Sequence, residues 1–98
     1  MHYVLFVRTD TTPDADLGHY LANVGATLAE HEGRLLAFGA PERLEGGVDY
    51  TRMALVAFPS ADAARAWYAS DAYQELAGWR VETMGHPVDV NLVAGLAA

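Results

Sequence analysis

The hydrophobic pattern in the first third of the chain predicts a strand followed by a helix. A continuous apolar run with aromatic and β-branched residues at positions 3–7 predicts a strand that is buried on both faces. From residue 13 onward apolar residues recur every three or four positions, which predicts a helix. Thr12 is its expected N-cap, and Gly33 is the expected left-handed residue after its end near Glu32. The apolar stripe of this helix consists of Leu17, Tyr20, Leu21, Val24 and Leu28.

A second row of small residues runs along the same predicted helix. Small side chains let a helix approach a sheet closely, and glycine in a helix interior costs about 1 kcal/mol relative to alanine. Two glycines in one row therefore indicate close packing on a sheet. The row consists of Gly18, Ala22, Gly25 and Ala29.

The second part of the chain repeats the strand, helix and strand order. Strands are predicted at residues 34–38 and 50–58, and the latter is apolar on both faces. Ser60 is an expected N-cap, Ser70 marks a break where the helix restarts, and Gly78 is its expected end. Residues 88–93 alternate between apolar and polar side chains, which is typical of a half-buried strand at a sheet edge.

This element order predicts an α+β fold formed by residues 1–98 as a single domain. Two strand–helix–strand units give a ferredoxin-like βαββαβ arrangement, in which a four-stranded antiparallel sheet carries two helices on one face. The first and third strands are central in that topology. They are also the two strands that are apolar on both faces, so pattern and topology agree.

Two helices cover only one face of the sheet, so the apolar side chains on the other face predict a partner that covers them. It would expose either Tyr3, Leu5 and Val7 or the alternate residues Val4 and Phe6. An apolar patch of that kind is larger than soluble monomers usually expose. The simplest cover is a second copy related by two-fold symmetry, so a homodimer through the open sheet face is expected. The alternative is a monomer with an unusually apolar face.

Charge and composition narrow the function classes. Thirteen carboxylates face six arginines, there is no lysine, and the net charge is −7. An acidic domain repels phosphate backbones and anionic membranes, so neither is an expected partner. The lack of cysteine excludes disulfides and thiolate metal sites, and no apolar stretch reaches the roughly 18 residues that span a bilayer. A cytoplasmic protein is expected. The missing lysine fits either a GC-rich genome or adaptation to salt.

Three segments resemble one bacterial family. Residues 58–76 read FPSADAARAWYASDAYQEL, residues 29–34 read AEHEGR and residues 44–46 read LEG. They resemble the helix signature, the helix-end histidine–glycine segment and the middle loop of the domain of unknown function thirteen-thirty (DUF1330). The chain departs from the family at Glu32, where a second glycine is usual, and in a compact segment at residues 46–50. The resemblance implies the dimeric α+β barrel superfamily, but no activity.

Candidate ligand-binding residues lie near the ends of strands. His31 could act as a general base at the mouth of a cleft, or simply interact with the terminal carbonyls of its helix. Arg34, Glu45 and Arg52, if they converge, could hold a small carboxylate, because arginine binds carboxylates in a fork. The alternative is an ordinary ion pair between strands. Tyr3 could supply a polar group in the space beside the sheet.

Three functions remain open. The main hypothesis is a homodimer that binds a small apolar or carboxylate-bearing metabolite in a cleft beside the sheet. The alternatives are a non-catalytic structural or interaction module and a cofactor-free enzyme of the monooxygenase or isomerase type, the latter by analogy with superfamily relatives. The histidines, His2, His19, His31 and His86, are not spaced as metal ligands, and no phosphate-binding glycine loop is present, so no metal or cofactor is expected.

Overall fold

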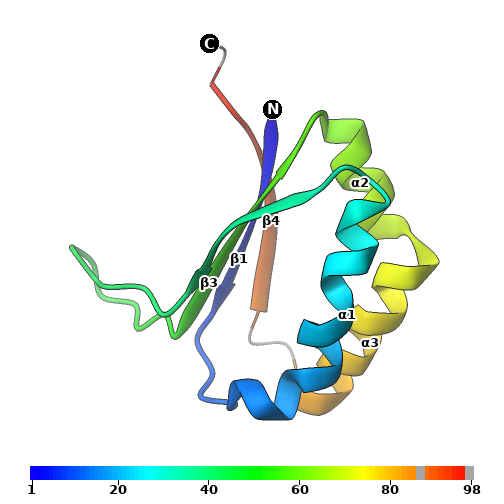
Figure 1. Cartoon of the computed structure of the whole chain (residues 1–98). Helices are drawn as coiled ribbons and strands as arrows, with labels where there is room; N and C mark the ends of the chain where they lie inside the picture. Colours follow the sequence, from blue (N-terminus) through cyan, green and yellow to red (C-terminus); the bar gives the residue numbers. More distant parts are fainter. Residues whose placement is uncertain (86–87, 97–98) are drawn as a thin grey trace.

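The computed structural model describes residues 1–85 and 88–96, in which a four-stranded antiparallel sheet is covered on one face by helices (Figure 1). The strands are β1 (His2–Arg8), β2 (Arg34–Gly39), β3 (Arg52–Phe58) and β4 (Val88–Ala94). The helices are α1 (Gly18–Ala29), which follows the short 3-10 helix η1 (Asp14–Leu17), α2 (Ala61–Ala69) and α3 (Asp71–Met84). The strand order β2-β3-β1-β4 makes β1 and β3 central, which confirms the ferredoxin-like prediction.

Strand register decides which side chains face the helices. Val4 pairs with Val56, and both are buried beneath the helices, so their neighbours point to the other face. On that open face Leu5 pairs with Leu55, and Leu5 is 37% exposed. The sequence left the two sets of β1 residues as alternatives. The structure places Val4 and Phe6 on the helix side, and Tyr3, Leu5 and Val7 on the open side.

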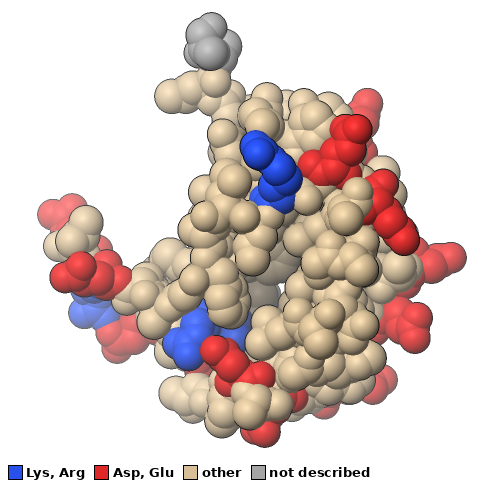
Figure 2. Space-filling model, in the orientation of Figure 1, with Lys and Arg blue, Asp and Glu red and all other residues tan. Residues whose placement is uncertain are grey.

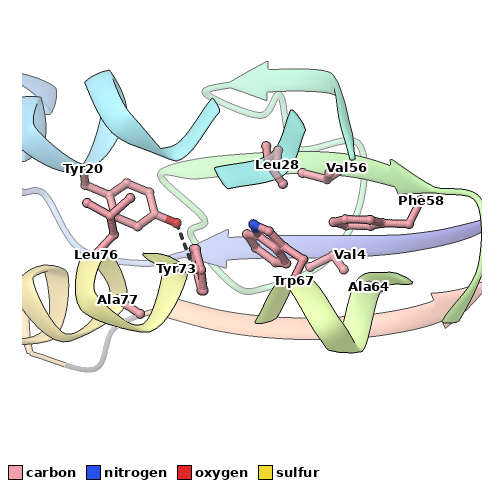
Figure 3. Close-up of a cluster of buried hydrophobic side chains, with 10 residues drawn as sticks. All are labelled: Val4, Tyr20, Leu28, Val56, Phe58, Ala64, Trp67, Tyr73, Leu76 and Ala77. Carbon is pink, nitrogen blue, oxygen red and sulfur yellow. Dashed lines mark hydrogen bonds between the residues drawn. The ribbon is translucent and has the colours of Figure 1, made fainter. Parts of the chain in front are cut away.

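The centre of the core is aromatic and joins α2 and α3 to the sheet (Figure 3). Phe58, Trp67 and Tyr73 are each 0% exposed, and the ring centroids of Trp67 and Tyr73 are 4.1 Å apart. The indole N–H of Trp67 donates a 3.0 Å hydrogen bond to the Thr27 hydroxyl, which ties α2 to α1. The aromatic residues of the second helical region are therefore mainly core residues.

Both serine caps predicted for the second helical region are present. The Ser60 hydroxyl accepts from the Ala63 N–H at 3.1 Å, and the Ser70 hydroxyl accepts from the Tyr73 N–H at 3.3 Å. The predicted stop at Gly78 is wrong, because α3 continues to Met84. Burial of α3 side chains on both sides of Gly78 outweighs the low helix propensity of one glycine.

The predictions for the two ends of α1 are also corrected. Thr12 does not cap the helix: its N–H donates to Asp10, and its carbonyl accepts from Arg8. At the other end the positive φ falls on Glu32, at 60°, and not on Gly33. Gly33 is required for space instead, since a Cβ there would lie 2.7 Å from the Phe58 ring.

The row of small residues on α1 is not buried against the sheet. All four members are exposed, so the predicted close packing is wrong. The larger stripe faces the sheet, with Leu17, Tyr20 and Leu28 buried and Leu21 and Val24 half-buried. These larger side chains, together with Gly25 of the small row, line a space between α1 and the sheet.

Candidate functional site

A cavity of about 340 Å³ lies between α1 and the helix-facing side of the sheet. Its wall is almost entirely apolar, and Leu35 and Phe38 of β2 are 55% and 47% exposed although they line it. Figure 2 shows the molecule hollowed between the sheet and the helices. We call this space the α1 pocket. Its apolar wall includes Phe6, Val24, Leu28, Phe38, Val56 and Trp67.

Three of the six arginines of the chain line the α1 pocket, and they come from three different elements. Arg8 ends β1, Arg52 begins β3 and Arg80 lies on α3. Arg8 and Arg52 are cross-strand partners, so the antiparallel register brings them together. The described residues that line the pocket include no aspartate, glutamate or histidine. Three guanidinium groups therefore lie in the wall of one cavity of an acidic protein.

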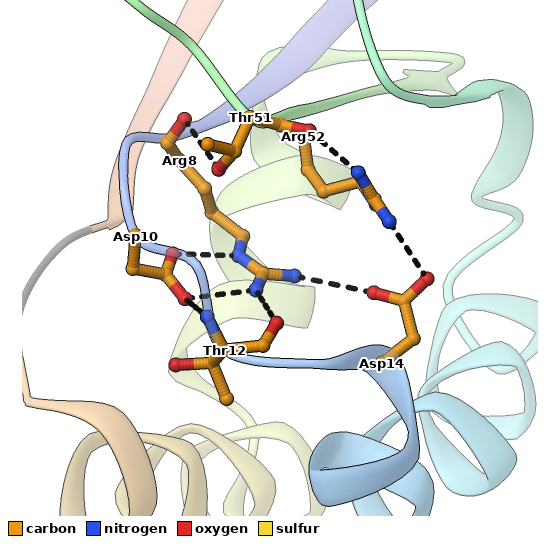
Figure 4. A network of polar contacts seen from close by, with 6 residues as sticks. All are labelled: Arg8, Asp10, Thr12, Asp14, Thr51 and Arg52. Carbon is orange, nitrogen blue, oxygen red and sulfur yellow. Dashed lines mark hydrogen bonds and ion pairs between the residues drawn. The ribbon is translucent and has the colours of Figure 1, made fainter.

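Two of these arginines are held by carboxylates (Figure 4). Arg8 binds Asp10 through Nε and Nη2, with both contacts at 3.0 Å, and Nη2 also donates to the Thr12 carbonyl at 3.1 Å. Asp14 lies between the two arginines, 3.8 Å from Nη1 of Arg8 and 3.4 Å from Nη2 of Arg52. Two positive and two negative charges thus offset each other in this network.

The network fixes the segment that connects β1 to η1 beside the pocket. Hydrogen bonding from Arg8 holds the pKa of the Asp10 carboxyl well below its ordinary range, so the carboxylate stays charged at all physiological pH values. Arg8 is only 8% exposed, and a buried guanidinium needs such partners. We conclude that Arg8 and Arg52 shape the wall of the pocket and that Asp10 and Asp14 largely satisfy their charges.

Arg80 differs from the other two arginines. It is 8% exposed, its Nε is buried without a hydrogen-bond partner, and it forms no ion pair with any residue that the structure describes. Its guanidinium carbon lies 5.5 Å from the centre of the Tyr20 ring, which is a cation–π distance. Arg80 is therefore a buried cation without a described counter-ion in the pocket wall.

Two buried phenols lie beside Arg80. The hydroxyls of Tyr20 and Tyr73 are 2.9 Å apart and join α1 to α3 (Figure 3). Burial raises the pKa of both phenols above their ordinary value, more strongly than the nearby Arg80 charge lowers it. Both phenols are neutral at physiological pH. They can donate or accept hydrogen bonds, but they cannot act as strong bases.

Of the residues predicted from the sequence to bind a ligand, Arg52 lines the α1 pocket. Arg34 and Tyr3 both pair with Ala57. Ala57 follows the helix-facing Val56 in β3, so these three residues lie on the open face. His31 lies in the turn after α1, and Glu45 is exposed in the loop between β2 and β3. Arg34 and Arg52 thus lie on opposite faces of the sheet, so Arg34, Glu45 and Arg52 do not converge on one ligand.

Sequence reasoning did not find Arg8, Arg80 or Tyr20 as pocket residues. A signal for Arg80 exists: it falls in helical spacing with Tyr73, Leu76 and Ala77, all of which are buried. An arginine at the next position of an apolar stripe indicates a buried charge that requires explanation.

Neither a metal-binding cluster nor a membrane-spanning helix is found in the described part of the chain. Across residues 1–85 and 88–96, no three His, Asp or Glu side chains lie close enough together to hold a metal ion, and His86 lies outside these residues. No helix in the same ranges is long and apolar enough to cross a membrane.

Several solved structures share this fold. A dimeric ferredoxin-like protein of unknown function from Jannaschia sp. CCS1 is 19% identical, with a TM-score of 0.73 over 96% of this chain and 98% of that one. The Arabidopsis thaliana protein At3g17210 is 19% identical, with a TM-score of 0.70 over 99% and 96% of the two chains. SnoaB, a cofactor-independent oxygenase from Streptomyces nogalater, is 14% identical, with a TM-score of 0.59 over 99% and 93%.

These identities establish a shared fold and leave the activity open. No curated protein sequence matches the chain. The model of the family described as Domain of unknown function (DUF1330) matches residues 2–96, and the chain therefore belongs to this family, as the helix signature had indicated.

Proposed function

We propose that this protein binds a small, largely apolar molecule in the α1 pocket. The observation that carries the proposal is the pocket itself: about 340 Å³ with an apolar wall and a few polar groups at defined positions. Sites for small molecules usually combine a space of this size with that kind of lining. The pocket is larger than the gaps left by ordinary side-chain packing, so core formation alone does not account for it.

Binding is favoured over catalysis by the groups that line the pocket. The cofactor-independent oxygenase SnoaB has the same fold, so cofactor-free chemistry is the second candidate. Such chemistry commonly begins with proton abstraction, which needs a base near neutral pKa. The described lining has no carboxylate or imidazole, and the phenol of Tyr20 is neutral. The pocket is therefore better suited to holding a molecule than to deprotonating one.

Tryptophan fluorescence gives a direct test of binding. The chain has two tryptophans, of which Trp67 lines the pocket and Trp79 does not. In a Trp79→Phe background, a bound ligand should change the emission of Trp67. A panel of aromatic and aliphatic compounds should contain members that change this emission and also raise the melting temperature. At a ligand concentration of 100 times Kd, binding should stabilise the folded protein by about 2.7 kcal/mol.

A blocked pocket supplies the matched control. Ala54 lies on the helix-facing side of β3, between Phe6 and Phe38 in the cross-strand register, and lines the pocket. Ala54→Leu should fill part of the space and abolish the response to ligand. Ala22→Leu adds the same side chain on the exposed side of α1 and should leave the response intact. Equal binding by both variants would place the ligand elsewhere.

We also propose that the protein is a homodimer that pairs through the open sheet face. Apolar side chains of the two central strands lie there without helical cover, and the connection between β2 and β3 projects on the same side (Figure 1). Leu44 in that connection is 91% exposed. The Jannaschia relative of this fold is a dimer. Burying these surfaces against a second copy would remove them from water.

A further inference from the structure

We propose that the ligand of the α1 pocket is an anion with an apolar body and that Arg80 binds its charged group. This inference rests on the proposed binding function and adds the class of ligand to it. It stands on three observations: Arg80 is almost fully buried, it lines the pocket, and it has no carboxylate partner among the described residues. Its buried Nε also lacks a hydrogen-bond partner.

A buried guanidinium without a counter-ion is unfavourable. Arginine does not lose its proton in proteins, so Arg80 cannot become neutral to avoid the cost of desolvation. The ring of Tyr20 at 5.5 Å offers a cation–π contact, which compensates only part of the lost hydration. An anionic ligand group would supply both the missing charge and an acceptor for guanidinium hydrogen bonds.

The other pocket arginines are poor candidates for this role. Arg8 already binds Asp10 through two hydrogen bonds, and Asp14 contacts both Arg8 and Arg52. Their charges are offset within the protein. A ligand anion beside this network would be repelled by Asp10 and Asp14 as well as attracted by the arginines. At Arg80 the described pocket lining presents no carboxylate. The charge that is available to a ligand is thus the one on α3.

The surroundings of Arg80 indicate the chemistry of the ligand. The phenol of Tyr20 lies beside Arg80 and stays protonated. When it accepts from Tyr73 in the hydrogen bond between the two hydroxyls, its own proton is free to be donated to an anion. The rest of the wall is apolar and offers few partners for hydroxyl or amide groups. A compact planar anion, such as a carboxylate or an enolate, attached to an aromatic or aliphatic body fits this arrangement. Sugars and phosphate esters with many polar groups do not.

Matched acids and amides test the inference. The probes are 2-naphthoic acid, 4-phenylbutyric acid and decanoic acid, each paired with its primary amide, and binding is read from Trp67 fluorescence in the Trp79→Phe background. At pH 7 the favoured acid should bind at least tenfold more tightly than its amide. Arg80→Met should weaken the acid at least tenfold and leave the amide within about twofold. Arg65→Met, a change on the exposed side of α2, should affect neither.

The outcomes separate this inference from the function on which it rests. If no acid and no amide binds, the proposed binding function fails. If each acid and its amide bind the wild-type protein equally tightly, the pocket binds apolar molecules but the inference of an anionic ligand is wrong. This comparison uses the wild-type arginine and does not depend on any change at Arg80. If the acid preference persists in a folded Arg80→Met protein, another group holds the anion and the role of Arg80 is refuted. Arg80→Lys keeps the charge and should retain part of the preference, which provides a second variant should the methionine protein fail to fold.

Discussion

The turn that ends α1 leads to opposite predictions for two adjacent residues. The Gly33 N–H donates to the Leu28 carbonyl at 2.9 Å and the Glu32 N–H donates to the Ala29 carbonyl at 3.3 Å, which is the Schellman pattern with Glu32 in the left-handed position. Glycine is favoured at this position, yet the chain has glutamate there and places its glycine one residue later. Glu32→Gly should therefore stabilise the protein, and Gly33→Ala should destabilise it.

The two magnitudes follow from local geometry. A left-handed backbone costs a non-glycine residue about 1–2 kcal/mol, and the extra freedom of glycine in the unfolded chain offsets about 0.4–1 kcal/mol of any gain. Glu32→Gly should thus add about 0.5–1 kcal/mol. At Gly33 a new Cβ would lie 2.7 and 2.9 Å from two atoms of the fully buried Phe58 ring, and 3.1 Å from Leu28. Overpacking of this kind costs about 1–3 kcal/mol.

Urea unfolding at pH 7, followed by circular dichroism, measures both effects. The protein concentration is kept fixed, because it would change the apparent stability of the proposed dimer. Gly78→Ala is the control: Gly78 lies inside α3, and a Cβ there would meet nothing within 4 Å beyond the local helix backbone, so the change should stabilise by about 1 kcal/mol. A Gly33→Ala protein as stable as wild type would refute the steric argument. A loss of stability in Glu32→Gly would refute the assignment of strain to Glu32.

Three further predictions concern the buried polar groups and the open face. Tyr20→Phe and Tyr73→Phe should each lower the free energy of unfolding in urea by about 1–2 kcal/mol, because each leaves one buried hydroxyl without its partner. The double variant should lose about 1 kcal/mol less than the sum of the two single losses, whereas additive losses would contradict a direct hydrogen bond. Asp10→Asn should lose about 1–3 kcal/mol at pH 7. The lowered pKa of Asp10 stabilises the fold above about pH 4, and that contribution is lost as the pH falls further. The difference in unfolding free energy between wild type and Asp10→Asn should therefore be smaller at about pH 2.5 than at pH 7. An equal difference at both pH values would contradict the argument. Leu55→Asp should give a folded monomer by light scattering, whereas a persistent dimer would place the interface elsewhere.

The topology was predictable because the strand patterns and the element order constrain each other. The strands at residues 2–8 and 52–58 are apolar on both faces, as the two central strands of this fold must be, and the alternating strand that ends the chain lies at the edge. The serine caps were also predictable, since a hydroxyl acts on a backbone N–H only three residues away.

The errors arose where glycine was interpreted by its average behaviour. Gly78 was expected to end a helix, but the burial of Leu76, Ala77 and Arg80 carries α3 past it. Gly33 was expected in a left-handed turn, but its lack of a side chain makes room for the Phe58 ring. Both outcomes depend on contacts between segments far apart in the sequence, which local propensities do not contain.

The candidate site was harder to predict than the fold for the same reason. Arg52 was identified, but its neighbour in the pocket is Arg8, and that pairing follows from the register of β1 and β3. Register cannot be read from two strands that are apolar on both faces, because a shift of one residue leaves an equally apolar pattern. Arg80 was missed because ending the helix at Gly78 removed it from the buried stripe to which it belongs.

An acidic protein with a pocket for anions is not a contradiction, because the two effects act at different distances. The carboxylates spread over the outer helical surface in Figure 2 repel a polyanion along its whole length, which is the reason that nucleic acid is not an expected partner. A small anion experiences that repulsion only within the Debye length, about 8 Å at physiological ionic strength, and inside the pocket it meets Arg80 in an apolar wall where screening is weak. Salt should therefore increase the rate at which a small acid enters and change its affinity little, whereas binding driven by exposed surface arginines would weaken as salt rises.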